Sequence, residues 1–195
     1  MFIKAYSKDP AIIYFENLIK NSDCDEIIKY FSKKKLQPSK SSGPSNYRKS
    51  KSISINKDIE KLKPISSILK KLFNSNMGDF EKPVLQKYSI NDEYPDHFDA
   101  FNPLSNNNEN FIQRKNTIII YLNDNFIGGE TFFHEQNIII KPKKGSLLIF
   151  ENCFKGTNHI HPLSRHSGKK VIDGDKWIIT LWSKTKDPIN LENYL

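Results

Sequence analysis

The stretch NTIIIYLND (116–124) is followed at short intervals by ETFFHEQNIII (130–140) and GSLLIF (145–150), and KWIITLWSK (176–184) closes the series. VLQKYSI (84–90) has the same character and precedes them. These runs are rich in β-branched and aromatic residues and are bounded by Asn, Gly and Pro, which is typical of β-strands. Five short strands without intervening helices predict a sandwich, a jelly roll or a small barrel.

The N-terminal part of the chain has a different pattern. AIIYFENLI (11–19) predicts a strand, and DEIIKYFSKKK (25–35) continues a short helix with Ser22 as its N-cap and lysines at its end. A second helix is expected after Asn56, because apolar residues recur there at three- and four-residue spacing. Pro64 should kink or interrupt this helix.

The domain organisation follows from these two patterns. We expect an α+β chain in which residues 1–75 form a helical, basic supporting segment and residues 76–195 form the β-rich core. The first segment alone would make only a thin core, so residues 1–195 are interpreted as one domain. The Ser-, Lys- and Pro-rich stretch 36–52 predicts a flexible loop, which we interpret as a lid over a substrate.

Composition excludes several classes of protein. The chain has 195 residues, of which 37% are hydrophobic and 27% charged, as expected for a soluble globular protein. No apolar run approaches the roughly 20 residues that span a bilayer, and the N-terminus lacks a secretory signal pattern. Cys24 and Cys153 are too few for a disulfide framework. We therefore expect a soluble, cytoplasmic or otherwise intracellular protein.

The basic charge is confined to one part of the chain. Residues 1–75 contain 16 Lys/Arg and 7 Asp/Glu, a balance of +9, whereas the remainder contains 14 and 15, a balance of −1. A solvated, Lys-rich surface explains this best, as in a protein of a virus or an AT-rich microbe. A nucleic-acid partner is not expected, because basic and aromatic residues do not alternate as they do where single strands stack. The oligomeric state is left open.

The segment HFDAF (97–101) suggests a metal site. In a strand, residues i and i+2 point to the same face, so His97 and Asp99 should project together. They are two of the three ligands of the facial triad that holds non-haem Fe(II). The third ligand must be a distant histidine, and composition does not choose among the candidates, which are His134, His159, His161 and His166.

The last predicted strand begins ten residues after His166. Its residues Lys176, Ile178, Thr180 and Trp182 share one face. A lysine that points into a small barrel beside a metal is costly unless a fixed anion meets it. A dicarboxylate cosubstrate would supply that anion.

Six ordered blocks between about residues 84 and 184 carry a family resemblance. They are Tyr88 with Tyr94, His97-x-Asp99, YLND (121–124), GGET (128–131), PKKGSLLIF (142–150), and the run of His166, Gly168, Val171, Gly174, Lys176 and Trp177. The chain resembles the 2-oxoglutarate- and Fe(II)-dependent dioxygenases, and specifically the catalytic domain of the prolyl 4-hydroxylase family. Upstream, Arg48-Lys49-Ser50 is similar to an Arg-Thr-Ser sequence in that family's active-site loop.

This resemblance implies a fold and an activity. The fold would be a double-stranded β-helix (a jelly-roll, cupin-like core) with N-terminal supporting helices. The cofactors would be Fe(II), 2-oxoglutarate and O2, with ascorbate as reductant. The reaction would be prolyl 4-hydroxylation of a proline-containing peptide or protein, with release of succinate and CO2. No membrane partner is implied.

The resemblance also implies a role for each matching residue. His97, Asp99 and His166 would bind Fe(II). Lys176 would pair with the distal carboxylate of 2-oxoglutarate. Tyr88 and Thr131 would hydrogen-bond to 2-oxoglutarate, and Trp182 would line the pocket.

Alternatives remain open at this point. The substrate could be a free amino acid or another small molecule, or the chain could be a non-catalytic jelly-roll binding protein. Among the other histidines, His134 is expected to be structural or part of a pocket wall. His159 and His161 are expected to be exposed in a loop, and Tyr121 is expected to serve packing.

Overall fold

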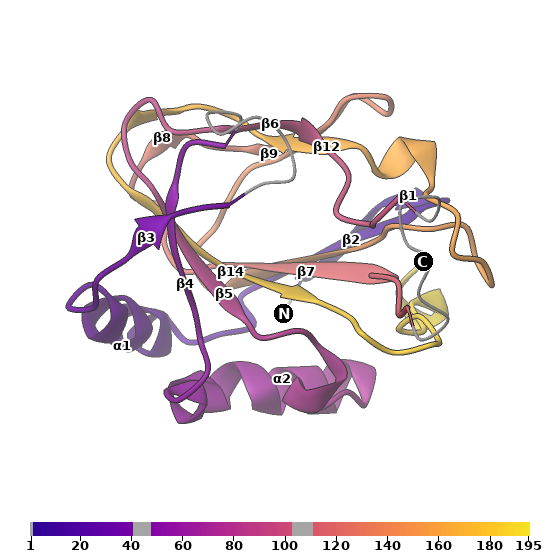
Figure 1. The fold of residues 1–195 in the computed structure, drawn as a ribbon, viewed down its shortest axis with the longest axis horizontal. Helices are drawn as coiled ribbons and strands as arrows, with labels where there is room; N and C mark the ends of the chain where they lie inside the picture. The colour runs from indigo at the N-terminus through magenta and orange to yellow at the C-terminus, as the bar shows by residue number, and fades with distance from the viewer. Residues whose placement is uncertain (1, 41–47, 103–110) are drawn as a thin grey trace.

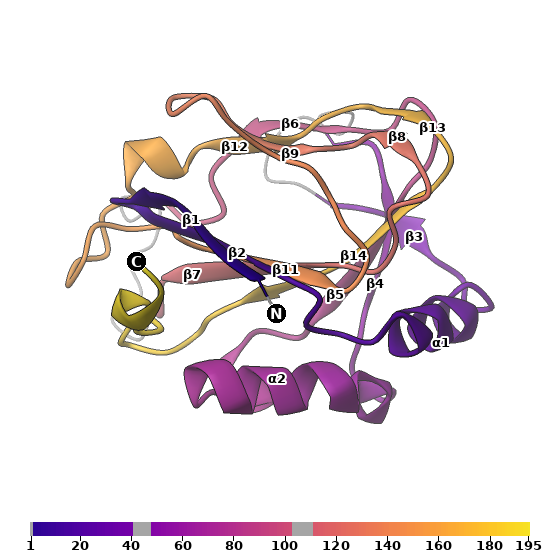
Figure 2. The same ribbon diagram turned by 180° about the vertical axis from the view of Figure 1, so that it is seen from behind.

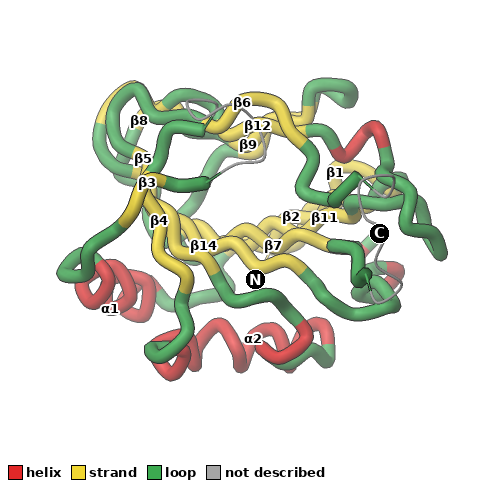
Figure 3. The backbone as a smooth tube through the Cα atoms, in the orientation of Figure 1, coloured by secondary structure: helices red, strands yellow, loops and turns green. Residues whose placement is uncertain are grey.

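The computed structural model describes residues 2–40, 48–102 and 111–195. Within these ranges, an eight-stranded sheet faces a four-stranded sheet, and a two-stranded sheet completes the fold (Figures 1 and 3). The strand order of the large sheet is β1-β2-β11-β7-β14-β5-β4-β3, and that of the four-stranded sheet is β10-β9-β12-β6. Every strand pair that is described is antiparallel.

The strands are short, and most come from the last 115 residues. The large sheet consists of β1 (Phe2–Lys8), β2 (Ala11–Glu16), β3 (Gln37–Pro38), β4 (Lys51–Ser54), β5 (Val84–Tyr88), β7 (Asn116–Tyr121), β11 (Ser146–Glu151) and β14 (Lys176–Trp182). The four-stranded sheet consists of β6 (Tyr94–His97), β9 (Thr131–Phe133), β10 (Ile138–Ile140) and β12 (His166–Gly168). The two-stranded sheet pairs β8 (Ile127–Gly128) with β13 (Val171–Asp173).

The alternation of side chains in the central strands divides the core into two layers. In β7, Ile118 and Ile120 belong to one buried cluster, whereas Ile119 and Tyr121 belong to the other. Both faces of this strand are therefore covered, which explains why its sequence is almost continuously apolar. The second cluster fills the space between the two larger sheets, where Phe133 of β9 meets Phe150 of β11 edge to face.

The two α-helices lie on the outer face of the large sheet, opposite the four-stranded sheet (Figure 2). They are α1 (Asn21–Phe31) and α2 (Lys63–Phe73). Phe31 of α1 and Leu69 of α2 are fully buried in the first cluster. The helices thus support the sheet from behind and leave the space between the sheets for a site.

The N-terminal segment differs from the expectation of a helical support. Residues 1–75 contribute β1 to β4 to the large sheet in addition to the two helices, because strands from both ends of the chain pair across it. Ser22 lies inside α1 and does not cap it; the N-cap position is Lys20. Pro64 does not kink α2 but stands in its first turn, where a missing N–H costs nothing. The interpretation of residues 1–195 as one domain stays a prediction.

Two further segments differ from the sequence-based expectation. The predicted strand 130–140 is a hairpin of β9 and β10, because Asn137 turns the chain with a φ of 51°. The predicted loop 36–52 contains β3 and the start of β4, which pair at the sheet edge. Residues 41–47, at the centre of the proposed lid, lie outside the described residues.

No helix in the described residues is long and apolar enough to cross a bilayer.

Candidate active site

His97 and His166 are brought together by strand pairing. His97 is the last residue of β6, His166 is the first of β12, and the two face each other as partners in the antiparallel ladder. Their rings lie 4.3 Å apart between centroids. Tyr94 stacks on the His97 ring at 3.5 Å and restricts its orientation.

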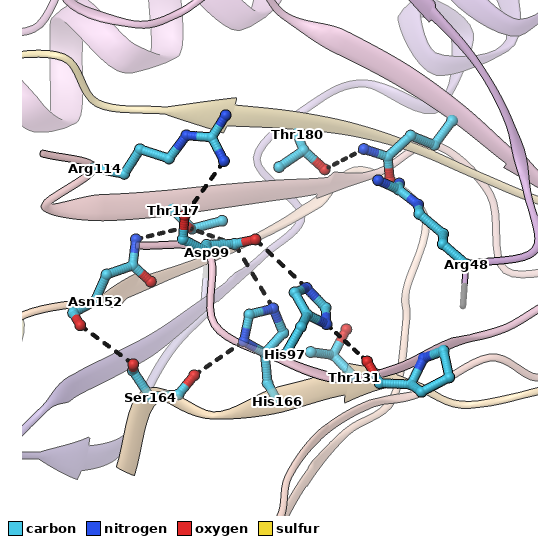
Figure 4. A network of polar contacts seen from close by, with 12 residues as sticks. Arg48, His97, Asp99, Arg114, Thr117, Thr131, Asn152, Ser164, His166 and Thr180 are labelled. Carbon is cyan, nitrogen blue, oxygen red and sulfur yellow. Dashed lines mark hydrogen bonds and ion pairs between the residues drawn. The ribbon is translucent and has the colours of Figure 1, made fainter. Parts of the chain in front are cut away.

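A backbone carbonyl holds the Nδ1 atom of each imidazole. His97 Nδ1 lies 2.8 Å from the Pro95 carbonyl, and His166 Nδ1 lies 3.0 Å from the Ser164 carbonyl (Figure 4). Because a carbonyl oxygen only accepts, each Nδ1 carries the proton and each Nε2 presents its lone pair. This is the arrangement by which proteins orient histidine ligands toward a metal.

Asp99 completes the cluster. Its Oδ1 lies 3.5 Å from His97 Nε2 and its Oδ2 lies 3.7 Å from His166 Nε2. One donor atom from each of the three residues lies within 4.8 Å of the others, and no second such group occurs in the described part of the chain. Asp99 follows β6 rather than lying in it, so the chain bends after His97 and still brings the two side chains together.

The electrostatics of the cluster favour ligation. Burial by itself would raise the pKa of the Asp99 carboxyl, but His166, His97 and a hydrogen bond from Thr117 outweigh it and hold that pKa well below its usual range. Burial lowers the pKa of His166 to about 4, with a further contribution from His97. At neutral pH the site therefore offers one carboxylate and a neutral His166 imidazole, which are the protonation states that bind metals.

Lys176 lies in the same cavity, on β14. It is 3% exposed, and its Nζ donates to the Gly129 carbonyl at 2.6 Å. In the described part of the chain, no carboxylate lies within ion-pair distance of this ammonium group. Burial lowers the pKa of Lys176 to about 7; Glu130 opposes this shift and Arg48 adds to it. The Nζ atom also lies over the Tyr88 ring at 5.2 Å from its centroid. A buried cation that has a carbonyl and an aromatic ring beside it but no carboxylate is suited to receive an anionic ligand.

Gly129 is required beside this lysine. Its φ of +68° favours glycine, and a Cβ atom there would lie 3.1 Å from Cδ of Lys176. The GGET motif therefore does more than form a turn, because it places a carbonyl oxygen against the ammonium group.

Tyr88 and Thr131 contribute hydroxyl groups to the cavity. Tyr88 of β5 is the cross-strand partner of Lys176, and its hydroxyl accepts from Arg48 at 3.0 Å and lies 3.2 Å from Gln86 Oε1. Thr131 Oγ1 pairs with the Tyr121 hydroxyl at 2.8 Å. Tyr121 is thus both packed in the core and the hydrogen-bond partner of a cavity residue.

Trp182 lies on the same face of β14 as Lys176. Lys176, Ile178, Thr180 and Trp182 all line the cavity, as the alternation of the strand predicts. The Arg114 guanidinium stacks on the Trp182 ring at 4.1 Å and donates two hydrogen bonds to the Glu81 carboxylate. Trp182 Nε1 is buried and has no hydrogen-bond partner among the described residues.

The residues present therefore fit Fe(II) and 2-oxoglutarate. Two imidazoles and one carboxylate form the donor set of the facial triad, which leaves further coordination positions open. The buried ammonium group of Lys176 and the hydroxyls of Tyr88 and Thr131 line the same cavity, where they can meet an acidic ligand.

The other histidines lie elsewhere. His134 Nε2 lies 2.5 Å from Asp96 Oδ1, and His134 lines a second groove rather than the cavity of the three converging residues. His159 is exposed, as expected. The expectation that His161 is exposed is wrong, because it is 3% exposed and packs its ring on Phe154.

Sequence analysis missed several residues of the site. Gln86 lines the cavity, and its position two residues before Tyr88 in one strand was a usable signal. Thr117 hydrogen-bonds to Asp99, but nothing local distinguishes it from other strand residues. Arg114 contacts the Asp99 carbonyl at 3.3 Å, and this contact depends on a fold that joins distant segments.

Comparison with known proteins agrees with this geometry. Residues 83–184 match the family described as the 2OG-Fe(II) oxygenase superfamily. An Acanthamoeba polyphaga mimivirus protein, provisionally named a prolyl 4-hydroxylase, is 33% identical over 175 residues, covering 87% of this chain and 72% of that protein. Prolyl 4-hydroxylase 13 of Arabidopsis thaliana is 26% identical over 90% of this chain and 72% of its own length.

Solved structures share the fold. The viral collagen prolyl hydroxylase from Paramecium Bursaria Chlorella virus-1, in its 2OG complex, superposes with a TM-score of 0.71 at 23% identity, covering 88% of this chain and 93% of that one. A Pseudomonas putida prolyl-4-hydroxylase gives 0.65 at 14% identity, covering 91% and 94%. The expectation of a jelly-roll core is thereby confirmed. The chain belongs to the 2OG-Fe(II) oxygenase superfamily and, within it, to the prolyl 4-hydroxylase family.

Proposed function

We propose that this protein hydroxylates prolyl residues of a peptide or protein at C4, using Fe(II), 2-oxoglutarate and O2. The observation that carries this proposal is that His97, Asp99 and His166 converge in the cavity that also buries Lys176. The prolyl substrate is supported by the names of the relatives from a mimivirus and from Arabidopsis.

In this proposal the three converging side chains hold the iron. The Nε2 atoms of His97 and His166 are the imidazole ligands, since each Nδ1 is bound to a carbonyl. The Asp99 carboxylate supplies the third ligand and one negative charge, and its lowered pKa keeps it ionised. Ascorbate would act as the reductant that keeps the metal ferrous.

Lys176 would bind the distal carboxylate of 2-oxoglutarate. The Gly129 carbonyl accepts one hydrogen bond from Lys176 Nζ, so the ammonium group retains further donors for an anion. Tyr88 and Thr131 would add hydrogen bonds from opposite walls, and Trp182 would line the pocket.

Bound Fe(II) and 2-oxoglutarate would supply the oxidation, in which one oxygen atom of O2 enters succinate, the other enters the substrate C–H bond, and CO2 is released. The protein's own contribution is to orient the ligands and the substrate and to exclude water. The buried Ile119 and Ile178, which line the cavity, serve the second purpose.

An intracellular setting is also part of the proposal. Cys24 and Cys153 are both free and buried, which supports a reducing environment.

The proposal can be tested with purified protein, Fe(II), ascorbate and 2-oxoglutarate. Succinate should form with proline-rich peptides, and mass spectrometry should find one added oxygen atom on proline. Matched peptides with alanine in place of proline are the control. Succinate formed equally with both peptides, or only with free amino acids, would contradict the prolyl substrate. Binding of 2-oxoglutarate without turnover of any substrate would favour a binding protein.

A further inference from the structure

The Asp99 carboxylate is held by a hydrogen-bonded pair of residues behind it. Thr117 Oγ1 donates to Asp99 Oδ2 at 2.8 Å, and Asn152 Nδ2 donates to the same Thr117 oxygen at 2.8 Å (Figure 4). Thr117 and Asn152 are both fully buried.

The direction of these bonds follows from their chemistry. A threonine hydroxyl has one hydrogen and can donate it in only one direction. Because the Asn152 amide can only donate through Nδ2, the Thr117 oxygen must accept from it and has its hydrogen free for Asp99. Asn152 therefore fixes which way the Thr117 hydroxyl points.

The same asparagine is connected to the segment that carries His166. Its backbone carbonyl accepts from His161 N at 2.9 Å, and the His161 carbonyl accepts from Ser164 Oγ at 2.7 Å. The Ser164 carbonyl in turn accepts from His166 Nδ1 at 3.0 Å. Asn152 is thus linked to the Asp99 carboxylate through Thr117, and to the His166 imidazole through the segment that contains His161 and Ser164.

Both residues stand on the central strands of the large sheet. Thr117 is in β7, paired with Phe150 of β11 on one side and with Trp182 of β14 on the other. Asn152 directly follows β11, and its N–H donates to the Lys115 carbonyl at 2.8 Å. Groups on such rigid elements are well suited to hold a ligand in position.

We propose that Thr117 and Asn152 are positioning residues that keep Asp99 a single-oxygen ligand. Thr117 takes one lone pair of Oδ2, which would favour Oδ1 as the oxygen that binds the metal. A carboxylate that bound through both oxygens would take a coordination position that 2-oxoglutarate or O2 requires. This inference rests on the proposed role of Asp99 as an iron ligand.

The test is anaerobic titration of the protein with Fe(II). Thr117→Val removes the hydroxyl while keeping the shape, and Thr117→Ser keeps the hydroxyl and is the matched control. Asn152→Asp keeps the shape but replaces the donor with an acceptor, so the Thr117 hydrogen should turn away from Asp99. The visible absorption band of the Fe(II)–2-oxoglutarate complex is the second measurement, because it responds to how the carboxylate binds.

Thr117→Val and Asn152→Asp should each weaken Fe(II) binding by about 10- to 100-fold and alter the absorption band. Thr117→Ser should stay within about threefold of the parent protein. The double variant Thr117→Val/Asn152→Asp should bind no more weakly than Thr117→Val alone, because Asn152 acts through Thr117.

Unchanged affinity and absorption in folded Thr117→Val would overturn the inference, as would multiplying losses in the double variant. If Asn152→Asp does not fold, the Thr117→Val and Thr117→Ser pair decides alone. Failure of the parent protein to bind Fe(II) would instead contradict the proposed function, so the two failures are distinguishable.

Discussion

His166 stands directly opposite His97 across the antiparallel pairing of β12 with β6. The same pairing aligns Gly168 with Tyr94, with an irregularity between the two pairs. Two residues far apart in sequence thus become neighbours through strand register. A shift of this register by one residue would turn His166 to the other face of the sheet.

The first prediction concerns this histidine pair. His166→Ala removes a proposed ligand and should weaken Fe(II) binding by more than about 100-fold, which exceeds the usual effect of changing an outer residue. Succinate production should fall in parallel. His159→Ala is the matched control, because His159 is exposed and lies outside the cluster. Full Fe(II) affinity in His166→Ala would show that another residue is the third ligand.

The second prediction concerns the charge of Lys176. Lys176→Met keeps much of the side-chain volume but removes the ammonium group, so the 2-oxoglutarate requirement should rise by roughly 30- to 150-fold, equivalent to about 2–3 kcal/mol. Steady-state kinetics at varied 2-oxoglutarate would measure this. Lys170→Ala, at an exposed position on the neighbouring segment, should leave the requirement unchanged. An equal effect of both substitutions would argue against a specific contact.

The third prediction concerns pH. Burial lowers the pKa of Lys176 from 10.5 to about 7, with Glu130 opposing and Arg48 reinforcing the shift. Only the ammonium form of Lys176 can pair with the carboxylate of 2-oxoglutarate. The affinity for 2-oxoglutarate should therefore fall as pH rises above about 7, and the protein should take up protons when it binds 2-oxoglutarate near that pH. Calorimetric titration in buffers of different ionisation enthalpy would measure the uptake.

Lys176→Arg supplies the control for this pH dependence. Arginine stays charged throughout this range, so any residual binding by the variant should lack the proton uptake. The free energy of unfolding of the ligand-free protein should change with pH in the opposite direction to 2-oxoglutarate affinity. Between pH 7 and 10.5 the unfolded chain binds more protons at Lys176 than the folded chain does. The contribution of Lys176 to the free energy of unfolding therefore increases as pH rises. A contribution that decreased with pH would contradict the lowered pKa.

The fourth prediction compares two glycines with similar backbone conformations. Gly129 and Gly156 have φ values of +68° and +71°, so an alanine at either position meets the same backbone strain. Only at Gly129 would the new Cβ approach Lys176, at 3.1 Å from Cδ, whereas nothing lies within 4 Å at Gly156.

Gly129→Ala should therefore weaken 2-oxoglutarate binding, and Gly156→Ala should not. Both should lower the free energy of unfolding through backbone strain of the order of 1 kcal/mol, and Gly129→Ala should lower it further because its Cβ also meets Phe126 at 3.1 Å. Binding isotherms together with thermal unfolding would separate the two effects. Normal 2-oxoglutarate affinity in folded Gly129→Ala would mean that Lys176 tolerates displacement from its place beside the carbonyl.

Part of the fold could be predicted from local pattern. The β-branched runs identified β7, β11 and β14 nearly to the residue, because strands buried on both faces have few polar interruptions. The N-terminal strand β1 was missed: its sequence FIKAYSK is half polar, since it is a sheet edge with mostly exposed or half-buried side chains. The β-propensity of the residues therefore gives little indication of a strand at such a sheet edge.

For the site, the sequence by itself determined the chemistry: a His-x-Asp pair, further histidines, and a lysine on one face of a strand with Ile178 and Thr180. Only the tertiary structure decided how they combine. It aligned His166 with His97, buried Lys176 beside Gly129, and connected Thr117 and Asn152 behind Asp99. The physical reason is that spacing along a strand fixes which side chains share a face, whereas cross-strand register depends on the packing of the whole core.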